Sequence, residues 1–182
     1  MMSEIKIDIA LSLNSMEAFF AEPDADPFDP ESRYISGIDD VVAQMRLKPR
    51  DLDNPSRLTV RLPETAVTPD TQSTLKAALD RYCSAKIVEN QQTINELRIS
   101  SRRQAISALI IVILLVVTTM LLVYLVPELQ VISGAIAGFI GIAIWVIFWD
   151  PIYNYVYAWR PNALDINVFK NLLTTALVVK NI

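Results

Sequence analysis

Two long charge-free runs dominate the second half of the chain. Residues 104–126 carry no charge, and residues 131–149 form a second such run. As helices these runs would measure roughly 34 and 28 Å, and a bilayer core is about 30 Å thick. Pro127 and Glu128 separate them. The pattern predicts a transmembrane hairpin with helices over these two runs, joined by a short external loop at residues 127–130.

Basic residues flank the two runs unevenly. Three arginines immediately precede the first run, Arg160 and Lys170 follow the second, and the connecting loop has neither Lys nor Arg. Segments rich in Lys and Arg stay on the cytoplasmic side of a membrane. We therefore predict a cell-membrane location, the inner membrane if the chain is bacterial. Residues 1–103 and 150–182 are expected on the cytoplasmic side, with both termini.

Small residues recur along one strip of the second run. Gly134 and Gly138 have GxxxG spacing, and Ala137 with Gly141 repeats the small-xxx-small pattern. Small side chains let two helix backbones approach closely inside a bilayer. We expect these four residues to be a helix-packing face, whose partner is either the first helix of the same chain or a neighbouring subunit.

Aromatic residues gather around the inner end of the second run. Aromatic rings with a polar group favour the headgroup region of a bilayer, so these positions predict an interfacial belt on the cytoplasmic leaflet. The belt residues are Trp145, Trp149, Tyr153, Tyr157 and Trp159. A ligand-binding aromatic box is the less favoured alternative, and an ion pair between Asp150 and Arg160 is conceivable from their proximity.

The polar part of the chain alternates apolar and polar residues in three places, as half-buried strands do. The predicted strands cover residues 5–11, 57–62 and 176–180, and short helices are predicted at residues 16–20, 37–45 and 165–173. A small sheet with helices against one face is the simplest arrangement. We therefore predict an α+β membrane protein: a two-helix transmembrane hairpin with a small cytoplasmic domain of about three strands and several helices. The C-terminal segment is expected to pack on the N-terminal domain.

A long helix is predicted to begin at residues 68–70, where Thr, Pro and Asp are typical of a helix start. No Gly or Pro follows until Pro127, which permits one continuous helix over the whole stretch. Leu75 and Leu79 suit a core face. Residues 87–101 follow 3-4 spacing with an Asn at a seam position. They fit either a short coiled-coil seam or, as we favour, a stalk packed on its own domain.

Composition narrows the possible chemistry. The chain has no histidine and a single cysteine, Cys83, which excludes Ser-His-Asp and Cys-His catalysis, His-ligated zinc and an intramolecular disulfide. The net charge of −4 argues against nucleic acid as a partner. Asp24, Asp26 and Asp29 suit a hard cation, but the glycine and the bidentate Glu of an EF-hand are missing. We expect a solvated acidic loop at residues 22–31, no metal and no cofactor.

Several short motifs occur together. They are Asp-Pro-Phe at residues 26–28, Arg-Leu-Pro-Glu at 61–64, Trp-Val-Ile-Phe-Trp-Asp-Pro at 145–151 and Tyr-Ala-Trp-Arg-Pro at 157–161. Their order resembles a family of uncharacterised two-span prokaryotic membrane proteins, which carry a Trp-x-Pro after the second span and a Tyr-x-Trp-x-Pro-like stretch shortly afterwards. Asp150 stands where that family has Arg or a similar residue. The resemblance implies a two-span fold and no assigned activity.

The predicted function is that of a non-enzymatic, membrane-anchored interaction or assembly protein. Its expected partners are the lipid bilayer and either itself or another membrane protein. The alternative is an oligomeric pore-forming or effector subunit, which requires a polar stripe that the few Ser and Thr residues of the runs do not form. A membrane-associated enzyme is less favoured still, because no spacing of Asp and Glu indicates an acid–base pair.

Overall fold

The computed structural model describes residues 6–21, 35–126 and 133–181. The chain divides into two compact units. We call Met1–Gln91 with Asn162–Ile182 the sheet domain, and Gln92–Pro161 the helical hairpin. The acidic segment at 22–31, the predicted external loop at 127–130, the Asp-Pro-Phe motif at 26–28 and the first residue of the N-terminal predicted strand lie outside the described residues.

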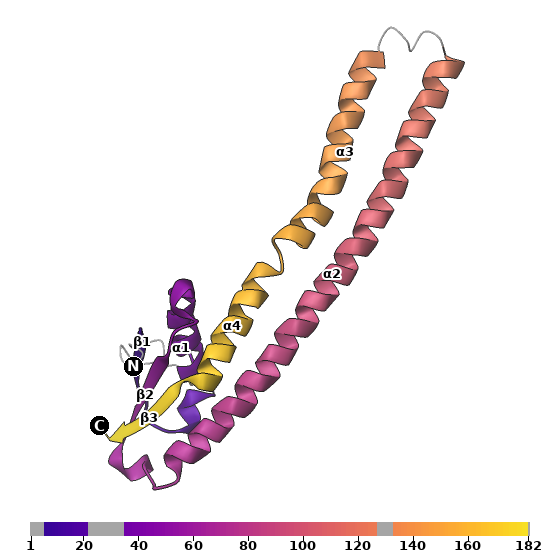
Figure 1. The fold of residues 1–182 in the computed structure, drawn as a ribbon. Helices are drawn as coiled ribbons and strands as arrows, with labels where there is room; N and C mark the ends of the chain where they lie inside the picture. The colour runs from indigo at the N-terminus through magenta and orange to yellow at the C-terminus, as the bar shows by residue number, and fades with distance from the viewer. Residues whose placement is uncertain (1–5, 22–34, 127–132, 182) are drawn as a thin grey trace, which may run out of the picture. The chain divides into compact units, whose positions relative to one another are not determined.

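The sheet domain contains three parallel strands, β1 (Ile7–Ser12), β2 (Ser56–Leu62) and β3 (Ala176–Asn181), in the order β1-β2-β3 (Figure 1). All three lie where the alternation predicts strands. Ile9 pairs with Leu58, and Leu58 pairs with Leu177 on its other side. The C-terminal strand therefore belongs to the same sheet as the N-terminal ones.

Parallel strands need a crossover connection, and the two crossovers of this sheet are very different. The first contains α1 (Gly37–Arg46), with the 3-10 turns η1 (Glu17–Phe19) and η2 (Pro49–Asp51) on either side. The second contains η3 (Glu64–Ala66), α2 (Thr71–Leu125), α3 (Ser133–Val156) and α4 (Arg160–Thr174). In chain order, the whole helical hairpin is thus inserted into the crossover between two paired strands.

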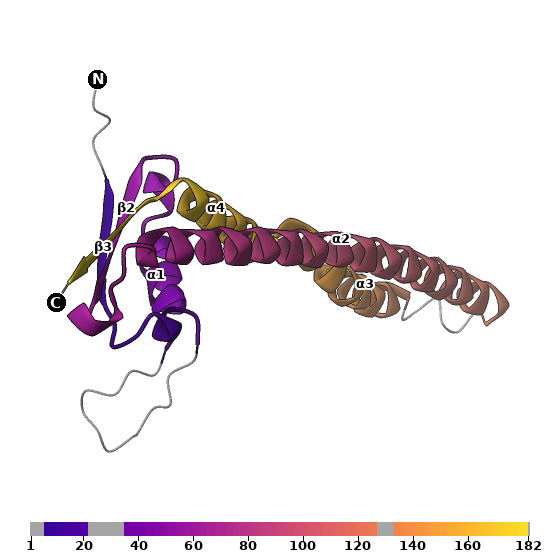
Figure 2. The same ribbon diagram turned by 90° about the horizontal axis from the view of Figure 1, so that it is seen from below.

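Helices cover one face of the sheet. Figure 2 shows α1, the first turns of α2 and α4 on the same side of the strands. The core between these layers is apolar; its largest buried side chains include Ile7, Leu11, Phe19, Ile38, Val41, Met45, Leu58, Val60, Leu62, Leu75, Leu79 and Leu172. On β1 the buried and exposed residues alternate strictly, so its second face is exposed to solvent.

Helix α1 starts at a well-formed cap. Ser36 Oγ accepts a hydrogen bond from the Asp39 backbone N–H at 3.2 Å and donates one to the Asp39 carboxylate at 2.6 Å. Gly37 follows because a Cβ there would lie 3.1 Å from the Phe19 Cα and 2.9 Å from a Leu11 methyl group. The predicted helix over residues 37–45 is confirmed.

Helix α2 begins at Thr71, slightly later than predicted. Residues 69 and 70 form a turn, because the Thr71 backbone N–H donates to the Thr68 carbonyl at 3.0 Å and the Thr71 hydroxyl accepts the Thr68 N–H at 2.8 Å. The helix then continues without a break to Leu125. The polar helix and the first apolar run therefore form one element.

Helix α3 continues beyond the predicted end of the second apolar run. The charge-free run stops at residue 149, whereas α3 passes through Pro151 and ends at Val156. A proline inside a helix removes one backbone hydrogen bond and usually kinks or ends the helix. Here the Pro151 ring is buried. Its packing helps to offset the backbone hydrogen bond that the proline cannot donate.

Candidate functional site

The face of the sheet that none of the described helices covers presents three rows of side chains across the strands. The register places Asp8, Arg57 and Ala176 in the first row, Ala10, Thr59 and Val178 in the second, and Ser12, Arg61 and Lys180 in the third. We call these nine residues the open face. Most of them line a shallow hollow of ≈520 Å³. Parallel sheets usually have both faces covered, so an uncovered parallel sheet is available to a partner.

The open face is cationic. Arg57, Arg61 and Lys180 contribute three positive charges, and Asp8 contributes one negative charge. Arg61 and Lys180 are direct cross-strand neighbours, and like charges in that relation destabilise a sheet. None of the ion pairs in the described part of the chain involves either residue. An acidic partner would relieve this repulsion.

Sequence reasoning missed this surface, although its signal was present. Arg57 and Arg61 occupy the polar positions of the predicted second strand, and Lys180 lies in the predicted third strand. What the alternation does not provide is strand order, direction or register. Only the parallel pairing of β2 with β3 brings Arg61 beside Lys180.

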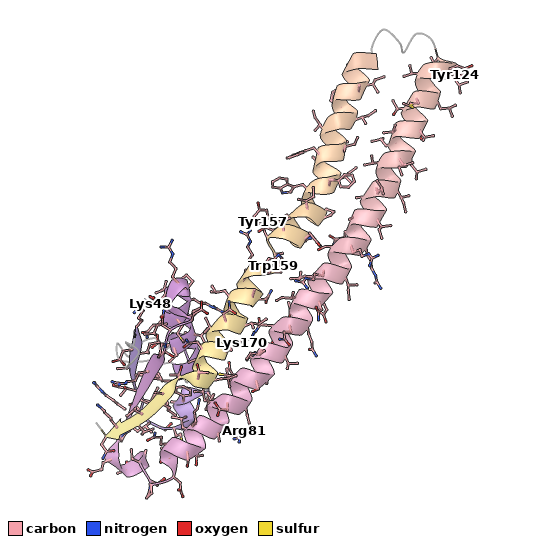
Figure 3. All side chains as sticks on the ribbon, in the orientation of Figure 1. Lys48, Arg81, Tyr124, Tyr157, Trp159 and Lys170 are labelled. Carbon is pink, nitrogen blue, oxygen red and sulfur yellow. The ribbon has the colours of Figure 1, made fainter. Side chains whose placement is uncertain are left out.

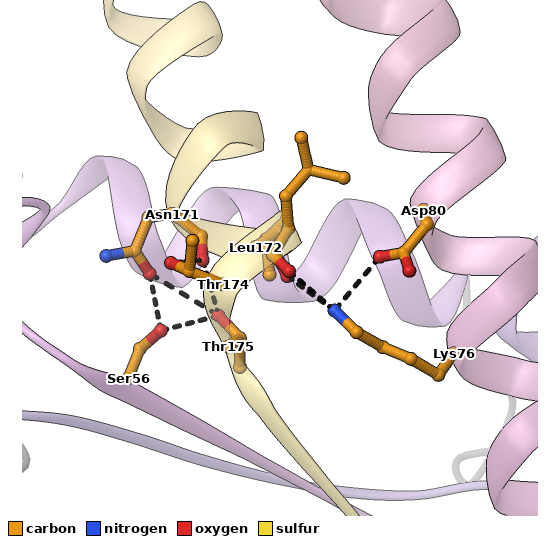
Figure 4. A network of polar contacts seen from close by, with 8 residues as sticks. Ser56, Lys76, Asp80, Asn171, Leu172, Thr174 and Thr175 are labelled. Carbon is orange, nitrogen blue, oxygen red and sulfur yellow. Dashed lines mark hydrogen bonds and ion pairs between the residues drawn. The ribbon is translucent and has the colours of Figure 1, made fainter.

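A buried polar network fixes the return of the chain into the sheet (Figure 4). The side-chain oxygen of Asn171 accepts a hydrogen bond from Ser56, whose hydroxyl also lies 2.5 Å from that of Thr175. The Asn171 amide donates to the carbonyls of Leu52, at 2.5 Å, and Asn54, at 2.9 Å. The network therefore joins the end of α4, the start of β3 and the turn before β2.

Lys76 stabilises the end of α4 from α2. Its ammonium donates to the carbonyl of Leu173 at 2.7 Å and approaches that of Leu172 at 3.5 Å (Figure 4). Carbonyls in the last turn lack helical partners, and a cation is favourable there. Asp80, one turn along α2, lies 2.9 Å from the same ammonium. The segments of α2 and α4 within the sheet domain are thus tied together.

Arg46 and Asp165 join α1 to α4. The guanidinium Nε and Nη2 each donate to one carboxylate oxygen at 2.7 Å, in a bidentate pair. The hydrogen bond to Asp165 raises the pKa of Arg46. These contacts are structural, since each group has its partner within the domain.

Cys83 is a buried residue of the core, as expected for a small apolar position. Its side chain is fully buried, and burial raises the pKa of the thiol to about 12. Nucleophilic cysteines react as thiolates. Cys83 therefore lacks the properties of a catalytic thiol.

The polar residues of the predicted seam are satisfied within α2. The Asn90 amide donates to the Lys86 carbonyl at 2.8 Å, and the Ser101 hydroxyl donates to the Leu97 carbonyl at 2.7 Å. Both hydrogen bonds lie within α2.

The helical hairpin exposes its apolar side chains. Among the described residues, two helices are long and apolar enough to cross a membrane, and only 6% of the most apolar window of each is buried. The core helix of a soluble protein would be mostly buried instead. Leu114, Met120 and Phe139 are 61%, 70% and 75% exposed, and large apolar surfaces of this kind mark membrane or protein contacts.

The glycines of the small-residue strip are not in close packing contact with another segment of the described chain. Apart from each glycine's chain neighbours and the adjacent backbone of α3, no heavy atom of the described residues lies within 4 Å of a Cβ built on Gly134, Gly138 or Gly141. Ala137 and Gly141 border a groove of ≈570 Å³ between α2 and α3. The three glycines therefore make no close contact with the first helix, and packing on a neighbouring subunit stays a prediction.

The predicted belt residues form a stripe along α3 and the turn that follows. Trp145 and Trp149 have ring centroids 5.6 Å apart, and Tyr153 and Tyr157 have centroids 5.8 Å apart. Residues 145 to 157 span about 18 Å of helix rise. Figure 3 places Tyr157 and Trp159 between α3 and α4. The stripe is taller than one headgroup layer, so an upright helix would place Trp145 deeper than Tyr157.

The conceivable ion pair between Asp150 and Arg160 is not among those formed by the described residues. The Arg160 guanidinium instead lies over the Tyr157 ring, 4.8 Å from its centroid. This contact is favourable because the ring face is electronegative. It orients Arg160 along the aromatic stripe.

Within the described residues, no three or more His, Cys, Asp or Glu side chains gather in a way that could hold a metal ion. The acidic segment at 22–31 lies outside that search. No protein-family model, curated protein or solved structure matches this chain. The resemblance to two-span prokaryotic membrane proteins therefore stays a prediction.

Proposed function

We propose that this protein is a non-enzymatic, membrane-anchored interaction or assembly protein. The helical hairpin is its anchor, and the sheet domain is held at the cytoplasmic surface of a cell membrane. The open face of the sheet is the surface that binds an acidic region of the partner, either a second copy or another membrane protein.

The observation that carries this proposal is the uncovered, cationic face of a parallel sheet. Arg61 and Lys180 are adjacent on it, and electrostatic complementarity selects partners and speeds their encounter. The open face belongs to the same domain whose strands β2 and β3 enclose the hairpin in chain order. The proposed anchor is thus inserted, in chain order, between two strands that carry the proposed binding surface.

Co-purification tests the proposal. The full chain is extracted from its own membrane in mild detergent, and the mass and stoichiometry of the complex are measured. We expect the wild-type chain to elute in a complex, and the double variant R61E/K180E to lose the partner because the face then repels acidic groups.

The matched control is K48E/R81E, which reverses two exposed charges away from the sheet (Figure 3). It should retain the complex. A wild-type chain that elutes as a monomer would contradict the proposal. A complex of unchanged mass and stoichiometry in R61E/K180E would also contradict it.

A further inference from the structure

A cleft in the helical hairpin combines two arginines with an apolar floor. Its volume is ≈570 Å³. We call it the arginine cleft; Arg98 and Arg102 of α2 and Phe148, Pro151, Ile152 and Tyr155 of α3 line it. It differs from the open face in location, since it lies entirely within Gln92–Pro161.

The two arginines present an uncompensated pair of charges. Arg98 and Arg102 are four residues apart, so they lie on one face of α2 and repel each other. None of the ion pairs among the described residues includes either of them. Guanidinium groups bind phosphate oxygens bidentately, which makes a phosphate the anion that suits this pair.

The rest of the cleft suits a hydrocarbon chain. Ile152 and Tyr155 are 51% and 65% exposed, and the cleft lining is mostly apolar. A free phosphate would leave this surface in contact with water. An amphiphile with a phosphate group would cover both parts.

The cleft also lies where the charge-free runs of the hairpin meet its charged segments. Arg103 and Asp150 are the charges that border the two charge-free runs, and the cleft residues fall on either side of these positions. In an inserted hairpin this is the headgroup level, and basic pockets between membrane helices on the cytoplasmic side bind anionic headgroups.

We propose that the arginine cleft binds an anionic phospholipid, with its phosphate between Arg98 and Arg102 and an acyl chain along Phe148 and Ile152. This site rests on the proposed membrane insertion of the hairpin. It would make the anchor selective for anionic bilayers.

Quenching of tryptophan fluorescence by brominated lipids tests the site, because all three tryptophans belong to the helical hairpin. The full chain is reconstituted in phosphatidylcholine vesicles with a small fraction of phosphatidylglycerol, and either lipid is brominated on its acyl chains. We expect preferential quenching by the brominated phosphatidylglycerol. The R98Q/R102Q variant should lose about thirty-fold in selectivity, at roughly five-fold per arginine.

The control is R81Q/R103Q, which removes two arginines of the same helix that do not line the cleft. It should keep most of the selectivity. Equal losses in both variants, no preference in the wild-type chain, or displacement by added glycerol phosphate would overturn the lipid site. If brominated phosphatidylcholine also fails to quench, the hairpin is not inserted and the proposed anchoring fails with it; quenching without preference rejects the lipid site alone.

Discussion

At the scale of single residues, the sheet domain depends on a few buried polar side chains that the sequence does not reveal. Asn171 is 6% exposed and serves Ser56, Leu52 and Asn54 at once. Its loss would leave the Leu52 and Asn54 carbonyls without this partner, while the Ser56 hydroxyl would keep its contact with Thr175. Each unsatisfied buried group costs about 1–3 kcal/mol. The alternation of apolar and polar residues predicts which neighbouring positions are buried. The hydrogen-bond partners of Asn171 cannot be predicted in this way, because they come from segments far away in the sequence.

Cys83 gives a prediction at this scale. Its thiol keeps its proton to about pH 12 in the folded domain, against an ordinary pKa of 9.0. The folded state therefore holds a proton that the unfolded state releases, so this contribution is complete below pH 9 and is lost as the pH rises toward 12. We expect the stability of the wild-type chain to fall more steeply above pH 9 than that of Cys83→Ala, by up to about 1.4 kcal/mol per pH unit.

Thermal unfolding of both proteins in the same detergent, measured across this alkaline range, checks the prediction. Comparing the two cancels the titration of Lys and Tyr residues, which both share. Parallel curves for the two proteins would contradict it.

At the scale of elements, helices and strands were largely predictable, and their ends were not. The apolar periodicity places α1 and the three strands, and the absence of Gly and Pro permits the continuous α2 (Thr71–Leu125). The charge-free run places most of α3, and the helix continues beyond that run, through Pro151 to Val156. The capping arrangement around Thr71 shifts the start of α2, since a turn competes with the first helical turn there.

The small-residue strip yields a prediction for α3. A Cβ at Gly138 meets no heavy atom of the described residues within 4 Å beyond its chain neighbours and the adjacent α3 backbone, so we expect Gly138→Leu to fold normally. If the strip packs on a neighbouring subunit, the added bulk separates the two backbones. We expect a smaller oligomeric mass in mild detergent with an unchanged unfolding temperature.

The control for this substitution is Phe139→Leu, which places the same residue at the adjacent, 75% exposed position. It should leave the mass unchanged. A Gly138→Leu chain with the wild-type oligomeric mass would show that the strip is not a subunit contact.

At the scale of the whole molecule, the helical hairpin and the sheet domain were both predictable from the sequence. Their connection, with the hairpin inserted between two paired strands, follows from the fold. Two apolar runs and three alternating segments indicate a hairpin and a small sheet. The open face could not be predicted, because the neighbours of Arg61 depend on strand order and direction. The pairing of β3 with β2 requires the chain to return, after the helical hairpin, to the domain it left.

The most direct test of this account is the side of the membrane on which each segment lies. Single cysteines are introduced as R50C, E128C and K180C in a Cys83→Ala chain, and intact cells are treated with a membrane-impermeant thiol reagent. We predict labelling at position 128 only, with positions 50 and 180 labelled after permeabilisation. Labelling of position 50 or 180 in intact cells, or protection of position 128, would contradict a hairpin anchor with a cytoplasmic sheet domain.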